Sequence, residues 1–358
     1  MRLLVNAAFA TGELVGITRY LQRMISRLSS LCKVTVLASD HRLFAETNCN
    51  LIPIPGWTQS VRGRSLWEVT LLRRYCTGEY DVLLCPTPIA PPGIRLPVIS
   101  IVHDLTPLVM SHMHSAEYKT MFWLGLQTLR WADAVVAVSD HTKSDLGRLK
   151  IVPPRRVYRV LEGPGLLPTE EENSFAQRFY PYILYVGGHW SHKNVTKLIA
   201  TFVRLKSKEK LKLVIVGGGP MEVTEKAVRK RGLENRIVLL SDLLDAQLSS
   251  LYTHCSAFVF PSLYEGFGLP VLEALAHGAP IACSHTSSIP EVAGKAALYF
   301  DPHSVKDMAS KVQILLDDST LVAELRNRGP DQASRFSWEK AASEIYQIAM
   351  ELMNHKVQ

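Results

Sequence analysis

The stretch FPSLYEGFGLPVLEALAHGAP, residues 260–280, carries the most informative local pattern of the sequence. The apolar run Ala257–Phe260 predicts a buried strand that ends at Pro261, and a glycine-containing loop follows it. Pro270 is typical of the first turn of a helix, and Gly278 is typical of the residue just beyond its end. A strand, a loop and a helix in this order predict an α/β fold, with backbone amides at the helix start that favour anions.

The same alternation of short apolar runs and helical patterns extends along the whole chain. Strands are expected at 2–5, 33–37, 82–85, 98–102, 134–138 and 157–160 in the first half, and at 182–186, 212–216, 237–239, 257–260, 281–283 and 297–300 in the second. Such near-continuous apolar strands favour parallel sheets covered by helices on both faces. The segment 163–175, rich in Pro, Gly and acidic residues, predicts a hinge between two doubly wound, Rossmann-like domains.

Length and composition agree with a globular protein of two domains. The chain has 358 residues, of which 47% are hydrophobic and 20% charged. Its six cysteines are scattered without a C-x-x-C pair, which favours a reducing, cytosolic compartment. No apolar run approaches the ~18–20 residues that a membrane span needs, and the apolar N-terminal stretch is too short for a signal peptide. Secretion and membrane spanning are therefore disfavoured.

The excess positive charge lies in the first half of the chain. Residues 1–165 contain 19 Lys and Arg against 12 Asp and Glu, whereas residues 166–358 contain 21 of each kind. This asymmetry suggests an anionic partner, either a membrane surface, a nucleic acid or a phosphorylated substrate. Because no RNA-binding aromatic motif or helix-turn-helix pattern is present, we expect no nucleic acid partner.

Two basic stretches are candidates for contact with a membrane surface. The helix expected after the first strand has an apolar stripe, which predicts a buried face formed by Ile17, Tyr20, Leu21, Met24, Ile25, Leu28 and Leu31. Another face of the same helix carries Arg19, Arg23 and Arg27. A second stretch, near Trp57, contains Arg62, Arg64, Trp67, Arg73 and Arg74. Such residues rest on anionic lipid or simply form a solvated surface.

The loop and helix of residues 260–280 combine a phosphate cradle with two carboxylates. Gly266 and Gly268 let backbone amides approach a ligand. Glu265 and Glu273 bracket this cradle, and carboxylates beside a phosphate bind hydroxyl groups. Glu273 suits the diol of a ribose, and Glu265 suits the hydroxyls of a group attached beyond the phosphates.

A second strand–loop–helix unit supplies positive charge. LYVGGHWSHKN, residues 184–194, leads from a strand into a helix that begins near Asn194. Lys193 is placed to neutralise a diphosphate, with His189 or His192 assisting.

Three positions in the first half follow expected strands. Gly12 and Gly16 form a further anion site of backbone amides. His103 and Asp104 follow the strand at 98–102, where either functional groups or a structural histidine is expected. Ser139 is either a ligand contact or a helix cap.

Other functional patterns are incomplete. VIVGGGP at 214–220 does not complete the dinucleotide fingerprint, and His112 and His114 lack the partners of a zinc site. A nicotinamide-dependent oxidoreductase is therefore a weaker alternative of another class.

With these residues in view, the chain resembles family 4 of the retaining glycosyltransferases with the GT-B fold. The likeness covers nearly the whole chain. It rests on the first Gly-rich loop, on the two glutamates that flank GFGLPVL, and on VHDL at 102–105, ADAVVAVSDHTK at 132–143, YVGGHWSHKN at 185–194, SSIPEVAGKAALYFDP at 287–302 and RFSWEKAA at 335–342.

The resemblance implies two domains that face each other across a cleft. These are an acceptor-binding domain at 1–165, joined by a final helix at 338–358, and a donor-binding domain at 176–337. It implies that His103, Glu265 and Lys193 act in catalysis. The donor-binding residues are expected to be Gly12, Gly16, Ser139, Gly187, Gly188, His189, Lys193, Ser241, Leu243, Glu265, Gly266, Phe267, Gly268, Leu269 and Glu273.

Within that set, the resemblance implies separate roles. Glu273 holds the ribose, the amides of Gly268 and Leu269 hold the diphosphate together with Lys193, and the stretch 241–243 lies near the base. One of Gly12 and Gly16 reaches the distal phosphate. Many relatives carry an Arg where this chain has Gly188 and His189, so the cationic contact rests more on Lys193.

The implied substrate is a nucleotide-diphosphate sugar, and no metal cofactor is expected. GDP-mannose is the preferred donor, with UDP-glucose, UDP-N-acetylglucosamine or TDP-rhamnose as alternatives. The expected acceptor is a glycan or a lipid-linked glycan of cell-surface polysaccharide synthesis. The expected location is the cytoplasm, at the inner face of the membrane if the basic half binds lipid. A catalytically inactive relative that binds nucleotide sugars is the remaining alternative.

Overall fold

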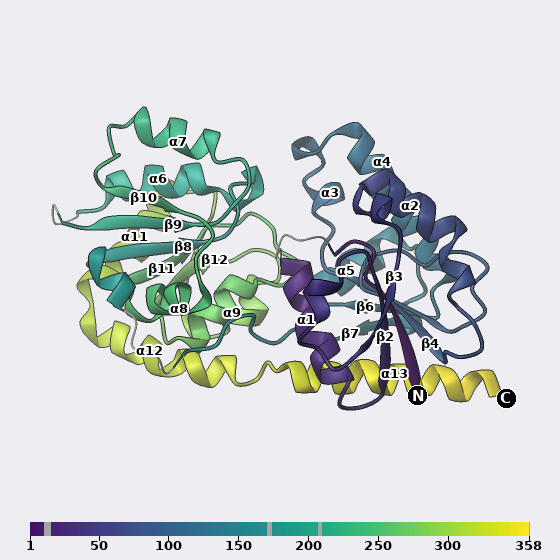
Figure 1. Cartoon of the computed structure of the whole chain (residues 1–358). Helices are drawn as coiled ribbons and strands as arrows, with labels where there is room; N and C mark the ends of the chain where they lie inside the picture. The colour runs from purple at the N-terminus through teal and green to yellow at the C-terminus, as the bar shows by residue number, and fades with distance from the viewer. Residues whose placement is uncertain (11–15, 170–173, 207–209, 358) are drawn as a thin grey trace. The chain divides into compact units, whose positions relative to one another are not determined.

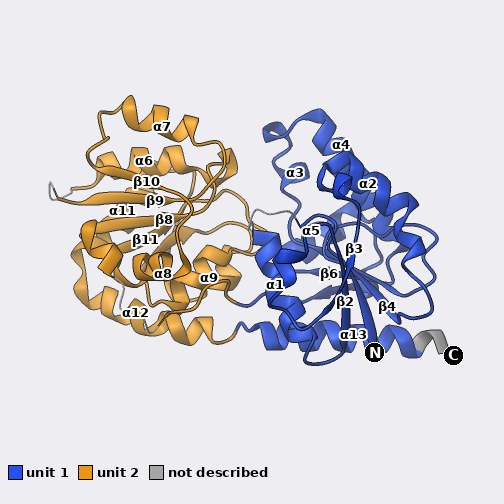
Figure 2. Cartoon of the chain, in the orientation of Figure 1, with its two compact units in different colours: residues 1–163, 336–358 blue, residues 164–335 orange. Residues whose placement is uncertain are grey.

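The structure is a computed structural model that describes residues 1–10, 16–169, 174–206 and 210–357. The chain forms two compact units (Figure 2): unit 1 comprises Met1–Gly163 and Phe336–Gln358, and unit 2 comprises Pro164–Arg335. Each unit contains one sheet whose strands are all parallel, with helices packed around it (Figure 1). The expectation of two doubly wound α/β domains is therefore confirmed.

Unit 1 has a seven-stranded sheet in the order β3-β2-β1-β4-β5-β6-β7. The strands are β1 Arg2–Asn6, β2 Lys33–Ala38, β3 Asn50–Pro53, β4 Val82–Cys85, β5 Val98–Val102, β6 Ala134–Ala137 and β7 Val157–Arg159. The helices are α1 Gly16–Leu28, α2 Val61–Thr70, α3 Thr106–Val109, α4 Ala116–Thr128, α5 Asp140–Leu149 and α13 Trp338–Val357. The strand order reverses between β1 and β4, which is where doubly wound sheets place their ligands.

Two sequence expectations in unit 1 differ from the structure. Strand β3 was not predicted, because its sequence NLIP has only two central apolar residues and it pairs with β2 alone at the edge of the sheet. The central part of the predicted apolar stripe of α1 is buried. Its two ends are wrong: Ile17 is 37% exposed, and Leu31 is 44% exposed because the helix ends at Leu28.

Unit 2 has a six-stranded sheet in the order β10-β9-β8-β11-β12-β13. The strands are β8 Tyr182–Val186, β9 Lys212–Val216, β10 Ile237–Leu240, β11 Ala257–Phe260, β12 Ile281–Ser284 and β13 Ala297–Phe300. The helices are α6 Val195–Arg204, α7 Glu222–Arg229, α8 Asp245–His254, α9 Leu269–Ala276, α10 Ile289–Ala293, α11 Val305–Asp317 and α12 Ser319–Ala333. Here the strand order reverses between β8 and β11.

No helix within the described parts of the chain combines the length and the apolar character that crossing a bilayer requires.

Candidate functional site

The loops that follow β8 and β11 flank the point where the strand order of unit 2 reverses. Lys193 ends a short 3-10 helix after β8, and Glu265 lies in the loop after β11. The Lys193 Nζ atom donates to Glu265 Oε1 at 2.7 Å, and the two side chains are 17% and 11% exposed. An ion pair of mostly buried groups thus lies at the position where an α/β sheet binds its ligand.

Hydrogen bonds to backbone carbonyls hold the two loops together. Asn194 adopts a left-handed conformation (φ 61°) at the start of α6, and its Nδ2 atom donates to the carbonyls of Pro261 (3.1 Å) and Pro302 (2.8 Å). The amide of Leu263 donates to the carbonyl of His192 at 2.8 Å. The position of the ion pair is therefore determined by the backbone as well as by the side chains.

Two serines at the start of α10 fix the loop that carries Glu265. The Glu265 amide donates to Ser287 Oγ at 2.9 Å. The hydroxyl of Ser288 is within 3.0 Å of the Glu265 carbonyl and 2.8 Å of the Phe267 carbonyl, to which it donates. Gly266 and Phe267 are buried in this loop. Because both residues are buried, they shape the backbone of the loop and do not present side chains to solvent.

The start of α9 has the geometry predicted for an anion site. Gly268 precedes the helix with φ 108°, a left-handed conformation that strains any residue with a Cβ. Leu269 is the first helical residue, and Pro270 lies in the first turn, as predicted. Gly278, with φ 63°, follows the helix end, also as predicted. The amides at the start of α9 therefore form a positive helix end beside Glu265 in sequence.

Glu273 is a buried carboxylate on α9. The Tyr252 hydroxyl of α8 donates to Glu273 Oε2 at 2.8 Å. The backbone of Gly165 approaches the other oxygen so closely that a Cβ at this position would lie 2.4 Å from Oε1. Sequence reasoning did not identify Tyr252, because an aromatic residue on a helix ordinarily belongs to the core.

Beneath Glu273, His277 completes a chain of hydrogen bonds. Its Nδ1 atom lies 2.7 Å from the Glu273 carbonyl, and its Nε2 atom lies 3.0 Å from Ser249 Oγ. Burial lowers the pKa of His277, which favours the neutral ring. This histidine therefore supports α9 and adds no charge to the site.

The glycines after β8 permit a tight loop. At Gly187 (φ 151°) a Cβ would lie 2.7 Å from the Tyr185 hydroxyl, and at Gly188 a Cβ would lie 2.9 Å from the Trp190 ring. His189 is buried, and its Nδ1 atom lies 2.8 Å from Thr224 Oγ1 of α7. Burial lowers the pKa of His189, so it offers no positive charge to a diphosphate at neutral pH. Of His189 and Lys193, it is Lys193 that brings positive charge to this loop.

Ser241 and Leu243 follow β10, the edge strand of the unit 2 sheet. They lie at the same edge of the sheet as the ion pair, because all strands are parallel, but β9 separates β10 from β8. Their expected contact with a base stays a prediction.

Two candidate residues of unit 1, His103 and Ser139, lie just beyond the carboxyl ends of β5 and β6. Gly16 is the first residue of α1, and Gly12 lies outside the described residues. Ser139 is fully buried and caps α5, because its Oγ accepts from the Thr142 amide at 3.0 Å. Of the two roles left open for Ser139, the structure shows the cap, and the ligand contact stays a prediction.

His103 is part of a buried polar cluster that sequence reasoning identified only in part. Its Nδ1 atom lies 3.1 Å from Oε1 of Glu162, which follows β7 and is buried. The ring of Tyr20 meets the His103 ring edge-on with centroids 4.6 Å apart, and Trp338 packs on Tyr20 at 5.3 Å. Among the described residues, His103 Nε2 has no hydrogen-bond partner. Glu162 thus holds the ring through Nδ1, while Nε2 is buried, and the expected contact of His103 with a substrate stays a prediction.

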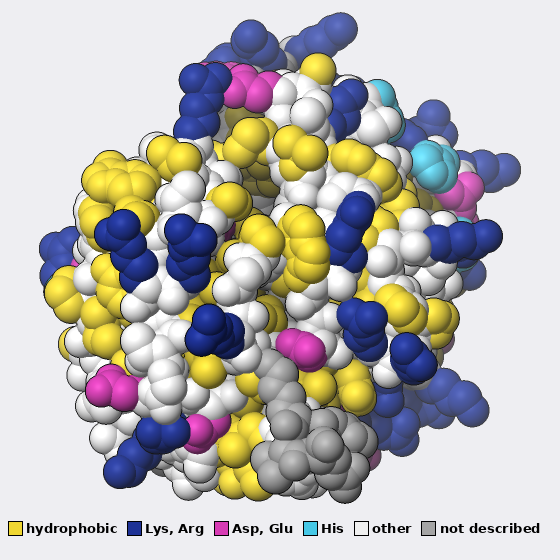
Figure 3. Space-filling model, turned by 90° about the vertical axis from the view of Figure 1, so that its right-hand side faces the viewer, with side chains coloured by type: hydrophobic (Ala, Val, Ile, Leu, Met, Phe, Trp, Pro, Cys, Tyr) yellow, Lys and Arg dark blue, Asp and Glu magenta, His cyan; other side chains and the backbone are white. Residues whose placement is uncertain are grey.

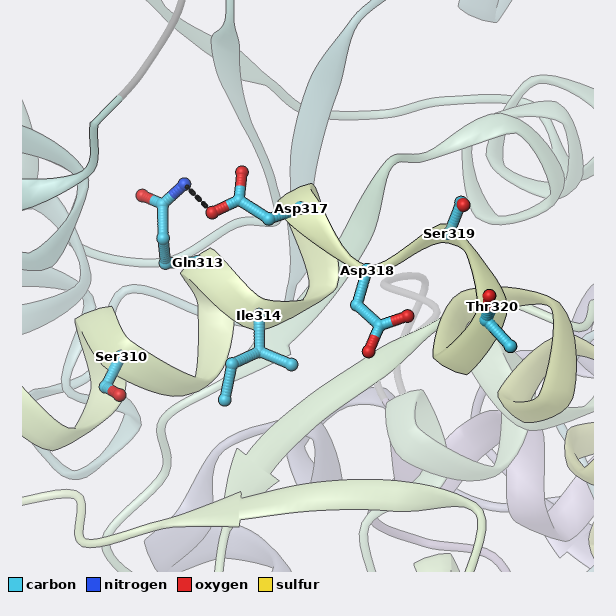
Figure 4. Close-up of a pocket in the computed structure, with 7 residues that line it drawn as sticks. All are labelled: Ser310, Gln313, Ile314, Asp317, Asp318, Ser319 and Thr320. Carbon is cyan, nitrogen blue, oxygen red and sulfur yellow. Dashed lines mark hydrogen bonds between the residues drawn. The ribbon is translucent and has the colours of Figure 1, made fainter.

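A surface hollow of about 690 Å³ lies elsewhere in unit 2, at the corner between α11 and α12. It is lined by Ser310, Gln313, Ile314, Asp317, Asp318, Ser319 and Thr320 (Figure 4). Gln313 donates to Asp317 at 3.0 Å, and apart from Ile314 the remaining lining is small or acidic. None of the candidate residues lines this hollow, and its acidic lining is unsuited to a phosphate.

The described residues contain no group of three His, Cys, Asp or Glu side chains able to hold a metal ion.

Comparison with known proteins agrees with this geometry. A family model described as "Glycosyltransferase Family 4" matches residues 15–163, and one described as "Glycosyl transferases group 1" matches residues 169–332. The O-antigen chain mannosyltransferase B of Escherichia coli is 29% identical over 261 residues, which are 69% of this chain and 68% of that protein. The serotype-specific mannosyltransferase WbdA of Escherichia coli is 28% identical over 68% of this chain, but this chain spans only 32% of it.

Among solved structures, Anabaena Alr3699/HepE in complex with UDP-glucose has a TM-score of 0.80 to this chain at 17% identity. The match covers 98% of this chain and 100% of that one, and at this identity it concerns the fold alone. The two family models account for the two units in order along the chain, and the fold agrees with both. The chain is therefore a glycosyltransferase that belongs with family 4 and the GT-B fold.

Proposed function

We propose that this glycosyltransferase moves a hexose, mannose in the first instance, from a nucleotide-diphosphate sugar to a hydroxyl of a glycan or lipid-linked glycan. The observation that carries the proposal is the Lys193–Glu265 pair at the switch point of unit 2, next to the start of α9. Such a donor has a diphosphate, a ribose and a sugar. A cation and a positive helix end suit the diphosphate, and carboxylates suit the hydroxyls of the ribose and the sugar.

The ion pair suits both ends of the donor. An ammonium group has three donors, so Lys193 keeps two for the diphosphate while it holds Glu265. The same contact offsets the charge of Glu265, which would otherwise repel the diphosphate. Glu265 then accepts hydrogen bonds from sugar hydroxyls. Glu273, held by Tyr252, accepts those of the ribose.

The proposed reaction proceeds with retention of configuration. The bond between the anomeric carbon and the distal phosphate oxygen breaks, and the acceptor oxygen bonds to the same face of that carbon. The proton of the acceptor hydroxyl passes to the departing phosphate oxygen. Lys193 and the amides of α9 stabilise the charge that develops on the diphosphate, which is the largest contribution in many such sites. These groups supply the stabilisation for which a metal ion is otherwise used.

GDP-mannose is the proposed donor because two relatives that each match more than two thirds of this chain, the O-antigen chain mannosyltransferase B and WbdA, are named mannosyltransferases. The structure of Alr3699/HepE with UDP-glucose supports UDP-glucose as the first alternative. The named role of the first relative in O-antigen synthesis supports a cell-surface glycan as the acceptor.

The experiment that tests this proposal is thermal unfolding of the chain with GDP, UDP, TDP and NAD and with the corresponding sugar conjugates. A ligand at ~100 times its dissociation constant stabilises by about 2.7 kcal/mol. We expect GDP and GDP-mannose to stabilise the protein selectively. The Glu273→Ala variant is expected to abolish this, and the matched variant Glu234→Ala, at an exposed loop position, is expected to retain it.

A graded variant sharpens the test. Tyr252→Phe keeps the ring and removes one hydrogen bond to a carboxylate, so we expect the donor dissociation constant to rise about tenfold. Stabilisation by UDP alone would mean that the donor is a UDP-sugar, and the proposed reaction class would stand. Stabilisation by NAD alone would indicate an oxidoreductase and contradict the proposal. Binding of GDP-mannose without transfer to any acceptor would indicate a nucleotide-sugar-binding protein.

A further inference from the structure

Trp190 is a large aromatic residue in the loop that carries Lys193, and it is 55% exposed. It immediately precedes the short 3-10 helix Ser191–Lys193. The Lys193 amide donates to the Trp190 carbonyl at 2.9 Å, so the backbone holds the two residues in a fixed relation. An indole open to solvent therefore lies in the same short loop as the cation of the candidate site.

Exposure alone does not mark Trp190 as functional, because exposed apolar residues are common on protein surfaces. Figure 3 shows hydrophobic side chains mixed with basic ones over the side of unit 1 that it views. Trp131 of unit 1, which precedes β6 at the amino edge of its sheet, is 51% exposed. Trp190 differs in position, because it follows β8 at the carboxyl edge, where the strand order of unit 2 reverses. This is the edge at which α/β sheets bind their ligands.

Glycines from two loops lie against the Trp190 indole. A Cβ at Gly188 would lie 2.9 Å from Cδ1 of the ring, and a Cβ at Gly219 would lie 3.5 Å from its Nε1 atom. Gly219 is the last of three successive glycines after β9. The His189 amide donates to the Gly218 carbonyl at 3.1 Å, which joins this loop to the loop of Trp190. The indole therefore borders backbone without side chains, which a flat ligand can approach closely.

The Trp190 indole lies on the side of Lys193 that is opposite to Glu265 in the sheet. In the strand order β9-β8-β11, Glu265 follows β11, whereas the indole approaches the loop after β9. The inference rests on the proposed function, in which Lys193 holds the diphosphate and Glu265 holds the transferred sugar. The sugar and the nucleoside are attached to opposite ends of that diphosphate. With the sugar on the side of β11, the nucleoside therefore extends toward the side of β9.

We propose that Trp190 stacks on the nucleobase of the donor. Every nucleobase has a flat aromatic face, and stacking on an aromatic side chain changes the affinity about 10- to 100-fold. A sugar in the same place would need partners for its hydroxyls, which the side chains of glycines do not supply. A purine offers two rings to the indole and a pyrimidine offers one, so the contact favours guanine over uracil. Trp190 is thus a specificity-determining residue for the donor.

The test is a thermodynamic cycle that removes the ring from the protein and the base from the ligand. Calorimetric titration of the full chain, without acceptor, compares GDP with ribose 5-diphosphate, which lacks the base. Trp190→Ala should raise the Kd of GDP about 10- to 100-fold and leave the Kd of ribose 5-diphosphate unchanged. Trp190→Phe keeps an aromatic face and should lose less affinity for GDP. The matched control Trp131→Ala removes an indole of similar exposure from unit 1 and should change neither Kd.

Tryptophan fluorescence gives a second readout of the same contact. A base stacked on an indole quenches its emission, so GDP should lower the fluorescence of the parent chain. Trp131→Phe should retain this decrease, and Trp190→Phe should lose it. A decrease of equal size in Trp190→Phe and in the parent chain would contradict the stacking.

The outcomes separate this inference from the proposed function. If Trp190→Ala weakens GDP and ribose 5-diphosphate equally, the residue maintains the loop of Lys193 and does not contact the base. If it weakens neither, the ring does not contact the donor. Either result overturns the inference, while the proposed function stands. If UDP or TDP binds in place of GDP, the preference for a purine is wrong, and the same cycle with that nucleotide tests the stacking. Failure of the parent chain to bind GDP, UDP or TDP would overturn both.

Discussion

The two sheets reverse their strand order in the same way, but the residues at the two reversal points differ in charge and exposure. In unit 2, Lys193 and Glu265 form an ion pair that is partly open to solvent. In unit 1, the last residue of β1, Asn6, donates from Nδ2 to Glu68 Oε1 at 2.8 Å, and both residues are buried. Topology thus determines where a ligand can bind, and the residues placed there determine whether charge is available to it.

The electrostatics of the two carboxylates follow from their partners. Glu265 has an ammonium group at hydrogen-bond distance. Glu68 has a neutral amide, and burial raises its pKa to about 7 despite that hydrogen bond and the charge of Arg64. Asn6 Oδ1 also accepts from the Ala8 amide at 3.2 Å. The unit 1 pair therefore shapes the backbone after β1, whereas the unit 2 pair offers charge.

The largest expected effect comes from removing the cation of unit 2. Lys193→Ala should lower kcat/KM about 10³-fold, because it removes the cation expected to stabilise the departing diphosphate and leaves Glu265 without its ammonium partner. Lys193→Arg keeps the charge and should lose much less. Steady-state transfer from labelled donor measures both.

A nearby lysine provides the control for this prediction. Lys197 of α6 donates to the carbonyl of His303 at 3.2 Å rather than to the ion pair. Lys197→Ala should therefore retain near-parental kcat/KM. Equal losses of kcat/KM in Lys193→Ala and Lys197→Ala would contradict this prediction, because they would show that the charge of Lys193 has no special role in catalysis.

The second effect concerns the stability of unit 1. The pKa of Glu68 is about 7 in the folded state against an ordinary value of 4.5, so the folded chain binds this proton more tightly than the unfolded chain does. Its contribution to stability is therefore fully present below about pH 4.5 and is lost as the pH rises to about 7, a loss of about 3 kcal/mol. Glu68→Gln mimics the neutral carboxyl and should lack this loss.

Denaturant unfolding at several pH values checks that sign. Tryptophan fluorescence reports mainly on unit 1, because Trp57, Trp67, Trp123, Trp131 and Trp338 lie there and Trp190 lies in unit 2. Glu68→Gln should match the parent chain near pH 4 and exceed its stability near pH 8. A variant less stable than the parent at both pH values would show that Glu68 stabilises unit 1 as a carboxylate.

The smallest expected effect concerns His103 and Glu162 of unit 1. Glu162→Gln replaces the acceptor of the His103 Nδ1 proton by an amide that can also donate, so the ring loses its fixed tautomer. We expect kcat to fall about tenfold while the KM for the donor stays unchanged. Nitrogen-15 NMR of the histidine rings should show a mixture of His103 tautomers. A raised donor KM with unchanged kcat would contradict this role.

The sequence predicted the fold well because its signals are local. Apolar runs of four to six residues bounded by loops indicate buried parallel strands, and the structure lacks none of those expected. Strand β3 could not be recognised in the same way, because an edge strand has neighbours on one side and needs less apolar character. The solvent exposure of Ile17 could not be predicted either. Helical periodicity shows which face of a helix is apolar, but it does not show which turn of that face lacks a packing neighbour.

The candidate site was predicted residue by residue but not contact by contact. Lys193 and Glu265 both stood out, yet their ion pair joins residues that are 72 positions apart and depends on β8 and β11 being neighbours. Glu162 was missed because it follows a three-residue strand at the start of a Pro- and Gly-rich segment, where loops are expected. Tyr252 was missed because an aromatic residue on a helix is ordinarily assigned to the core, and the sequence does not show that its hydroxyl donates to Glu273.

The division of the chain into units also bears on the order in which the protein is made. Unit 2 is one continuous segment, Pro164–Arg335, whereas unit 1 also needs Phe336–Gln358, which follows unit 2 along the chain. Helix α13 covers α1, and its Trp338 packs on Tyr20. During synthesis, all residues of unit 2 are therefore made before those of unit 1 are complete. The side of α1 that α13 covers stays without this helix until unit 2 has been translated.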